Sequence, residues 1–280
     1  MNKEILIKKA SGELELFSEN KLRRSLERVG TSSDVVEDIV SHIAGELKNG
    51  VSTQDIYRHA FSLLNKHDRS VAGKYSLKRA IMELGPTGHP FEKLVSEILK
   101  TKGFSTQVGV IVQGICVSHE IDVVAEKENQ HIMIECKFHN QPGTKSDVKI
   151  PLYIQARFED VRKAWLKNKD HAQKFHEAWL VTNTKLTSDA ITYAQCVGMK
   201  PIGWNYPVNE GLEVLIDQSG LHPITCLTML DAGDKQRLLN EDVVLCKELL
   251  HNKDILQNLG LNTVEISQVE KEISELCKTV

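Results

Sequence analysis

Three polar residues stand on two apolar stretches in the middle of the chain. Asp122 lies in the stretch 121–125, and Glu135 and Lys137 end the stretch 132–137. Both stretches have the length and composition of β-strands. Because alternate side chains of a strand face the same side, Glu135 and Lys137 project together. The pattern therefore predicts a carboxylate and an amine side by side, with a second carboxylate on a neighbouring strand.

These residue types fit the hydrolysis of a phosphodiester bond. That reaction needs hard oxygen ligands for Mg²⁺ or Mn²⁺, and a cation that stabilises developing charge or positions the attacking water. Asp122 and Glu135 would be the ligands, with the carbonyl of the peptide between residues 135 and 136 as a third. Lys137 would supply the charge, and Glu92 could reach the metal through water. The alternative is that these charges form only the polar face of a half-solvated hairpin.

The elements around these residues follow from the hydrophobic periodicity. The pattern predicts a helix from Pro90, three strands, a helix, a strand, and then a further helix and strand. The order is αβββαβ with an αβ extension. The predicted ranges after the first helix are 108–112, 121–125, 132–137, 151–168, 178–182, 188–197 and 200–204.

Residues 88–205 resemble the PD-(D/E)XK nuclease superfamily, and most closely its Mrr-like restriction endonuclease branch. The matching pieces are the predicted helix 90–95, the Glu-Ile-Asp at 120–122 and the Glu-Cys-Lys at 135–137. The proline that precedes the family's first aspartate is absent. The resemblance implies metal-dependent cleavage of DNA, although some members have lost activity or serve as resolvases or scaffolds.

Several polar residues near the motif are further candidates for the site. Gln155 and Arg157, on the helix after the third strand, could support the site or touch a phosphate; an ordinary solvated helix face explains them equally well. His119 and His139 flank the motif and are weaker candidates for metal ligands. The best local basic face is offered by six cationic residues of this region, Lys145, Lys149, Arg162, Lys163, Lys167 and Lys169.

The sequence pattern of the N-terminal part predicts a hairpin followed by about four helices. Two short alternating stretches, 5–7 and 14–17, are separated by Ala10-Ser11-Gly12. Ser18, Ser52 and Asp68 are predicted helix N-caps. Gly85 and Pro86 end the last of these helices.

The same part resembles the ATP-cone domain over about residues 3–85. The matching strings are 7–12, 21–26 and 75–80. The resemblance implies that ATP or dATP is a regulatory ligand, and it places Lys9, Gly12, Lys21 and Arg24 near the nucleotide. Glycine lets the backbone approach a phosphate, and the cations neutralise it. Ala10-Ser11 stands where many cones have Arg-Asp. No Walker-type phosphate loop occurs in the sequence.

The segment from about His222 is expected to be helical throughout. Residues 256–261 followed by the capping box of Asn262 and Glu265 are weakly similar to a helix-hairpin-helix, although a small bundle packed on the nuclease core fits better. We thus expect an α/β (α+β) chain of three parts. These are a cone at 1–86, a nuclease domain at 87–220 and C-terminal helices at 221–280.

Composition limits the function. The net charge is −3, so any DNA-binding surface must be local. No membrane span or secretory signal is evident, which predicts a cytoplasmic protein. The six cysteines never form a C-x-x-C pair, which favours reduced, mostly buried thiols.

The favoured function is a Mg²⁺-dependent DNA endonuclease, a homo-oligomer whose cone reports ATP or dATP levels. The alternative is a nucleotide-sensing DNA-binding regulator with a silent nuclease fold. Retention of Asp122, Glu135 and Lys137 together argues against that alternative.

Overall fold

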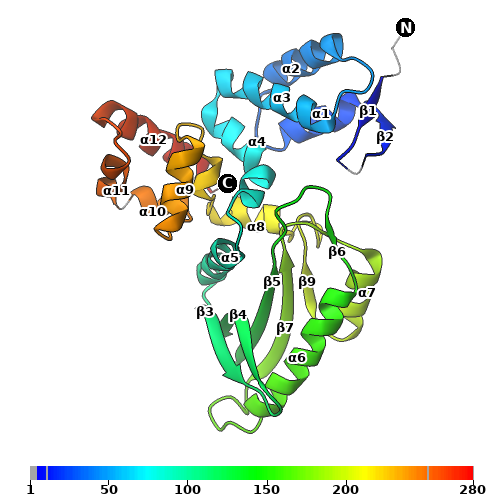
Figure 1. Cartoon of the computed structure of the whole chain (residues 1–280), viewed down its shortest axis with the longest axis vertical. Coiled ribbons are helices and arrows are strands. Elements are labelled where there is room, and N and C mark those ends of the chain that lie inside the picture. Colours follow the sequence, from blue (N-terminus) through cyan, green and yellow to red (C-terminus); the bar gives the residue numbers. More distant parts are fainter. Residues whose placement is uncertain (1–4, 11, 251, 280) are drawn as a thin grey trace.

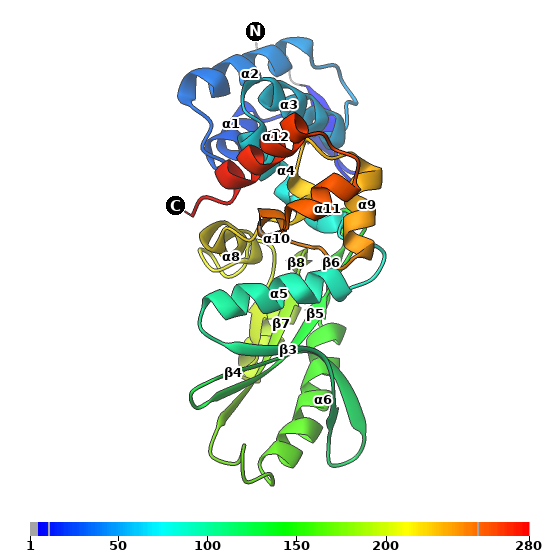
Figure 2. The ribbon, with the colours of Figure 1, turned by 90° about the vertical axis from the view of Figure 1, so that its left-hand side faces the viewer.

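The computed structural model describes residues 5–10, 12–250 and 252–279. Ser11 of the predicted hairpin turn and residues 1–4 of the predicted cone lie outside that part. The cone elements are at one end of the molecule and a five-stranded sheet is at the other (Figure 1). Helix α4, helix α8 and the C-terminal helices lie between them (Figures 1 and 2).

The N-terminal part folds as the sequence predicts, into a hairpin and four helices. Ser18, Ser52 and Asp68 each accept a hydrogen bond from a backbone N–H of the helix that follows, so the predicted caps are confirmed. The apolar stripes of these helices bury one core, to which Ile7 of the hairpin contributes. The elements are β1 (Leu6–Lys8), β2 (Leu14–Leu16), α1 (Glu19–Glu27), α2 (Ser33–Glu46), α3 (Thr53–His67) and α4 (Arg69–Met82).

The nuclease region has the predicted αβββαβ order and its αβ extension. The strands form one mixed sheet in the order β3-β4-β5-β7-β9, antiparallel from β3 to β5 and parallel beyond. The elements are α5 (His89–Thr101), β3 (Ser105–Gln113), β4 (Ser118–Lys127), β5 (Gln130–Lys137), α6 (Lys149–Trp165), β7 (Phe175–Thr182), α7 (Ser188–Cys196) and β9 (Lys200–Ile202).

Helices cover both faces of this sheet, which explains why its central strands are almost wholly apolar. Ile132 and Ile134 of β5 pack in one cluster with α5, whereas Met133 packs on the opposite face with α6 and α7. Alternation along β5 therefore places Glu135 and Lys137 on the α6 face.

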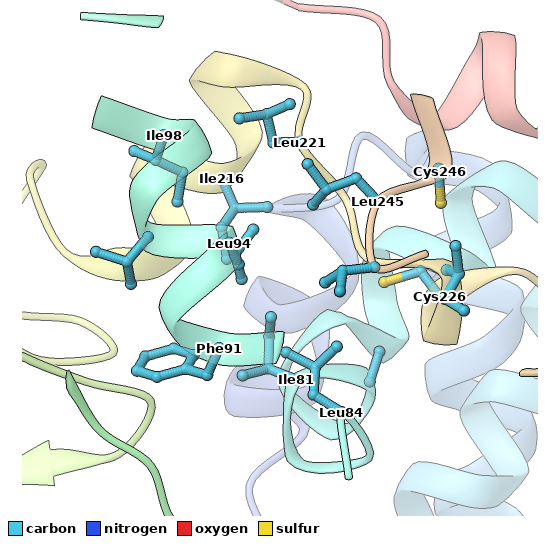
Figure 3. Close-up of a cluster of buried hydrophobic side chains, with 14 of the residues drawn as sticks. Ile81, Leu84, Phe91, Leu94, Ile98, Ile216, Leu221, Cys226, Leu245 and Cys246 are labelled. Carbon is cyan, nitrogen blue, oxygen red and sulfur yellow. The ribbon is translucent and has the colours of Figure 1, made fainter. Parts of the chain in front are cut away.

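The C-terminal helices share a core with the parts before them. Side chains from the end of α4, from α5 and α8, and from the segment after residue 220 form a single buried cluster (Figure 3). Thr225 Oγ1 donates a hydrogen bond to the Ala80 carbonyl at 2.8 Å, which ties this segment to α4. The elements are α8 (Leu212–Ser219), η1 (Ile224–Cys226), α9 (Ala232–Asn240), α10 (Cys246–Leu250), α11 (Lys253–Asn258) and α12 (Thr263–Leu276).

Some local predictions need correction. Helix α8 and the two-residue strands β6 (Lys145–Ser146) and β8 (Lys185–Leu186) were not predicted, because such short stretches carry no clear periodicity. All six cysteines are free, as expected, but Cys116 and Cys196 are exposed and Cys136 is half-buried, so only half of them are buried. Among the described residues, no helix is long and apolar enough to cross a bilayer.

Candidate active site

The strands bring the two predicted carboxylates together. Val123 of β4 pairs with Ile134 of β5 at the end of this antiparallel ladder, and Asp122 and Glu135 are the next residues on their strands. Asp122 Oδ2 accepts a hydrogen bond of 2.6 Å from the backbone N–H of Cys136, directly after Glu135. This bond fixes the Asp122 carboxylate against the partner strand.

The guanidinium group of Arg157, on helix α6, lies beside the two strands. Arg157 Nη1 lies 2.5 Å from Glu135 Oε2, and each side chain is 12% exposed. Arg157 also donates to the carbonyl of Glu120, which joins α6 to the strand that carries Asp122. Arg157 therefore supports the site, whereas Gln155 hydrogen-bonds to Glu159 of its own helix at 3.1 Å.

The carboxyl groups of Asp122, Glu135 and Glu92 repel one another in a partly buried space. Burial, followed by the nearby Asp122 carboxylate, raises the pKa of Glu135 to about 8, against the opposing effect of Arg157. Burial also raises the pKa of Asp122 and of Glu92, and Asp122 contributes to the shift of Glu92. Simultaneous ionisation of the three carboxyl groups is thus unfavourable here without a further positive charge.

This arrangement fits a divalent cation. Glu135 Oε1 is buried and has no hydrogen-bond partner, although a buried acceptor left unpaired is costly. A second carboxylate faces it, and both are hard oxygen donors of the kind that Mg²⁺ prefers. A bound cation would satisfy the unpaired oxygen and relieve the repulsion that raises these pKa values.

Lys137 and Glu92 lie at the edges of the same site. Lys137 ends β5 two residues after Glu135, on the same face and partly exposed. Glu92 is in the first turn of α5, and His89 Nδ1 lies 3.8 Å from its Oε2. The two flanking histidines have other partners: His119 contacts Asp160 at 2.9 Å, and His139 contacts Ser146 at 3.0 Å.

The predicted nucleotide residues gather in part around the hairpin. Lys9 and Lys21 both contact the carboxylate of Glu15, which lies on β2 between them. Gly12 has φ +88°, a left-handed conformation that favours glycine, and Arg24 is on α1 less than one turn beyond Lys21. Glu15 was not anticipated, although the alternation of Leu14-Glu15-Leu16 could have suggested it.

The nucleotide turn lies close to the nuclease region. A side-chain carbon at Gly143, in the loop that follows β5, would lie 3.8 Å from Cβ of Ala10. Figure 1 shows this loop rising from the sheet towards β1 and β2. Lys137 precedes the same loop, so the cone meets the segment that leaves the candidate active site.

Comparisons with known proteins agree with this arrangement. Residues 5–83 match the ATP cone domain, residues 85–202 match a family described as restriction endonuclease, and residues 222–277 match one described as AF1548-like, C-terminal. The predicted order of an ATP cone followed by an Mrr-like restriction endonuclease domain is therefore confirmed.

Two relatives extend this result. The chain is 39% identical over 183 residues to an uncharacterized protein of Archaeoglobus fulgidus, a match that covers 65% of this chain and 99% of that protein. It is also similar to the crystal structure of a protein of unknown function, AF1548, at 38% identity and a TM-score of 0.55, with 68% of this chain and 98% of that one covered.

Proposed function

The chain belongs to the AF1548-like family, and from that premise we propose that it is a Mg²⁺- or Mn²⁺-dependent DNA endonuclease whose activity responds to ATP or dATP bound by the cone. The observation that carries the proposal is the half-buried pair of Asp122 and Glu135. One Glu135 oxygen has no hydrogen-bond partner, and Lys137 follows on the same strand face. The restriction endonuclease match supports the reaction class.

Each residue has a role in this proposal. Asp122 and Glu135, with the carbonyl of the peptide that joins residues 135 and 136, hold the cation, which supplies positive charge against the phosphate. Lys137 stabilises the developing charge or positions the attacking water. Arg157 holds the Glu135 carboxylate in place, and Glu92 reaches the cation through water.

Regulation is proposed to pass through the turn at Lys9–Gly12. Lys9, Gly12, Lys21 and Arg24 would bind the triphosphate, and this would draw Lys9 and Lys21 away from Glu15. Ala10 of the turn lies near the loop after β5, where a Cβ added at Gly143 would lie 3.8 Å from Ala10 Cβ. A change in the turn therefore has a direct route to the segment that follows Lys137.

We assign three parts to the chain, at residues 1–86, 87–220 and 221–280. The last part shares its core with α4 and α5, so the assignment concerns sequence order and not independent folding. A homo-oligomer with two symmetric active sites would suit a cut through both DNA strands. Helices α11 and α12, joined through Gly260 with φ +88°, are a candidate helix-hairpin-helix for the DNA backbone.

Cleavage of supercoiled and branched DNA tests the proposal. Wild-type protein and Lys137→Ala would be compared with Mg²⁺, Mn²⁺ or EDTA, each with and without ATP. We expect metal-dependent nicking that falls at least 100-fold in the variant, by analogy with the loss of one charge-stabilising group. An ATP effect on wild-type cleavage would support regulation.

The same experiment tests the alternative function. DNA binding without cleavage of any substrate, under every metal and nucleotide condition, would overturn the nuclease proposal. It would favour a nucleotide-sensing DNA-binding regulator, to which the net charge of −3 offers some support.

A further inference from the structure

A second cluster of metal-ligating side chains lies at the far end of the same sheet. Glu126 is the last residue but one of β4 and His131 is the second residue of β5, and each is four residues from Asp122 or Glu135 along its strand. That separation is about 13 Å at roughly 3.3 Å per residue. His171 lies in the connection from α6 to β7, which Figure 1 shows at the end of the molecule opposite to the cone.

The donor atoms of these residues already converge. His131 Nε2 lies 3.2 Å from Glu126 Oε1, and His171 Nδ1 lies 3.8 Å from the same oxygen. One donor atom from each of the three residues lies within 4.8 Å of the others. Ligands at about 2.0–2.1 Å from a tetrahedral zinc ion are about 3.3 Å apart, so the observed spacing needs little adjustment.

Two of the three donor atoms face each other, and the third is unpaired. His171 Nδ1 is a buried atom without a hydrogen-bond partner, since 3.8 Å is too long for one. Lys174 Nζ holds the other Glu126 oxygen, Oε2, at 2.8 Å. Oε1 is therefore turned towards the two imidazoles, and the contact with Lys174 fixes the carboxylate in that orientation.

The surroundings favour a preformed site. The His131 side chain is 3% exposed, and its ring stacks on Trp165 at 3.9 Å and on His171 at 4.5 Å. The ring of His176 packs edge-on to His131 at 5.3 Å. Packing thus holds the His131 imidazole in place, whereas the His171 ring, stacked nearly parallel to it, would turn so that its in-plane Nδ1 lone pair points at the same ion.

From this geometry we propose that Glu126, His131 and His171 form a binding site for a borderline transition-metal cation of the Zn²⁺ class, separate from the candidate nuclease site. Two imidazoles and one carboxylate select zinc-like ions, whereas the all-oxygen nuclease site suits Mg²⁺. Three protein ligands leave a coordination position for water. The bound ion joins the hairpin between β4 and β5 to the connection that leads into β7.

Metal content after desalting tests the proposal without any activity measurement. Full-length protein would be stripped with chelator, incubated with ZnCl₂, desalted and analysed by mass spectrometry, with a parallel Co²⁺ titration followed by visible absorption. We expect a tightly bound zinc in the wild type, and at least 10-fold weaker binding in His171→Gln. The His171 side chain is 24% exposed, so that variant should fold.

Two controls locate the metal. Among the described residues, a second metal-ligating group is the largely exposed set of His42, Glu46 and His59, so His59→Gln should leave the tight zinc unchanged. Asp122→Asn should also leave it unchanged, which separates this site from the nuclease proposal. Zinc binding that survives both His171→Gln and Glu126→Gln, or no tight zinc in the wild type, would overturn the assignment.

Discussion

Arg157 of α6 is joined to Glu135 of β5 by an ion pair of 2.5 Å in which each side chain is 12% exposed. The guanidinium lowers the pKa of Glu135, but burial outweighs this effect and raises the pKa to about 8. Arg157 therefore helps to keep Glu135 ionised, as a metal ligand must be. It also occupies only one of the two carboxylate oxygens, and the other, Oε1, has no hydrogen-bond partner.

Replacement of Arg157 by an uncharged residue should shift the pH dependence of cleavage. In Arg157→Met the pKa of Glu135 should rise further, so the midpoint of the Mg²⁺-dependent rate should shift up by about one pH unit. The pH profile of single-turnover nicking measures this shift. Lys163→Met, at an exposed position of the same helix, is the matched control. An unchanged midpoint in Arg157→Met would contradict this role.

The stability of the metal-free protein should fall as pH rises, because the Glu135 carboxyl group must then lose its proton. An unfolded Glu loses its proton near pH 4.3, whereas folded Glu135 holds it up to about pH 8. Between these values the folded state binds more protons, so the free energy of unfolding decreases with increasing pH. Glu135→Gln should abolish this part of the decrease, on the order of 4–5 kcal/mol by pH 8.

Denaturant titrations at pH 5 and pH 8 in EDTA would measure the effect. The exposed Glu241→Gln is the control and should follow the wild type. A decrease of equal size in Glu135→Gln would show that other groups cause it. Mg²⁺ should restore stability to the wild type at pH 8 if it binds the ionised form.

The fold was largely predictable because its local signals agree. The capping side chains Ser18, Ser52 and Asp68 each begin a helix where expected, and the apolar strands of the sheet lie within one to three residues of their predicted bounds. Helix α8 was missed because no periodic stripe distinguishes its eight residues. The cores that the C-terminal helices share with α4 and α5 depend on contacts between distant segments, which periodicity does not report.

The candidate site was predictable only along its strands. Spacing placed Glu135 and Lys137 on one face, and in the structure the Cys136 N–H next to Glu135 donates a hydrogen bond to Asp122. The contact with Arg157 depends on how α6 lies across the sheet, so the sequence left its role open. The cluster of His131 and His171 was not anticipated, because 40 residues separate the two and no motif connects them. The catalytic and nucleotide-binding roles stay predictions.

Two variants of the cone should change nucleotide affinity in opposite directions. The Glu15 carboxylate contacts both Lys9 and Lys21, and a bound triphosphate would have to compete with it. Lys21→Ala should weaken ATP binding about 10-fold, whereas Glu15→Gln should strengthen it several-fold. Calorimetric titration with ATP and dATP measures both. Arg23→Ala is the control, since Arg23 is paired with Glu37 on α2. Weaker binding in Glu15→Gln would argue against this competition.

Helix α4 should depend on close packing at Gly73. A Cβ at this position would lie 3.1 Å from the Cys226 carbonyl oxygen and 3.3 Å from the Leu276 side chain. Gly73→Leu should therefore destabilise the protein by about 1–3 kcal/mol through overpacking against the C-terminal segment. Gly45→Leu is the matched control, because a Cβ added at that exposed position on α2 would meet no atom of another segment within 4 Å. Thermal unfolding of the two variants should separate them, and equal melting temperatures would refute the packing argument.

The contact between Ala10 and the loop at Gly143 should carry the nucleotide signal. A larger side chain in Ala10→Leu would press on this loop whether or not nucleotide is bound, because the loop backbone is close enough that an added Cβ at Gly143 would lie only 3.8 Å from Ala10 Cβ. We expect ATP affinity within about 3-fold of the wild type, but a cleavage rate that no longer changes with ATP. Calorimetry and nicking assays on one preparation give the two values. A variant that keeps the full ATP effect would exclude this contact as the route, and loss of ATP binding would show that the turn belongs to the nucleotide site itself.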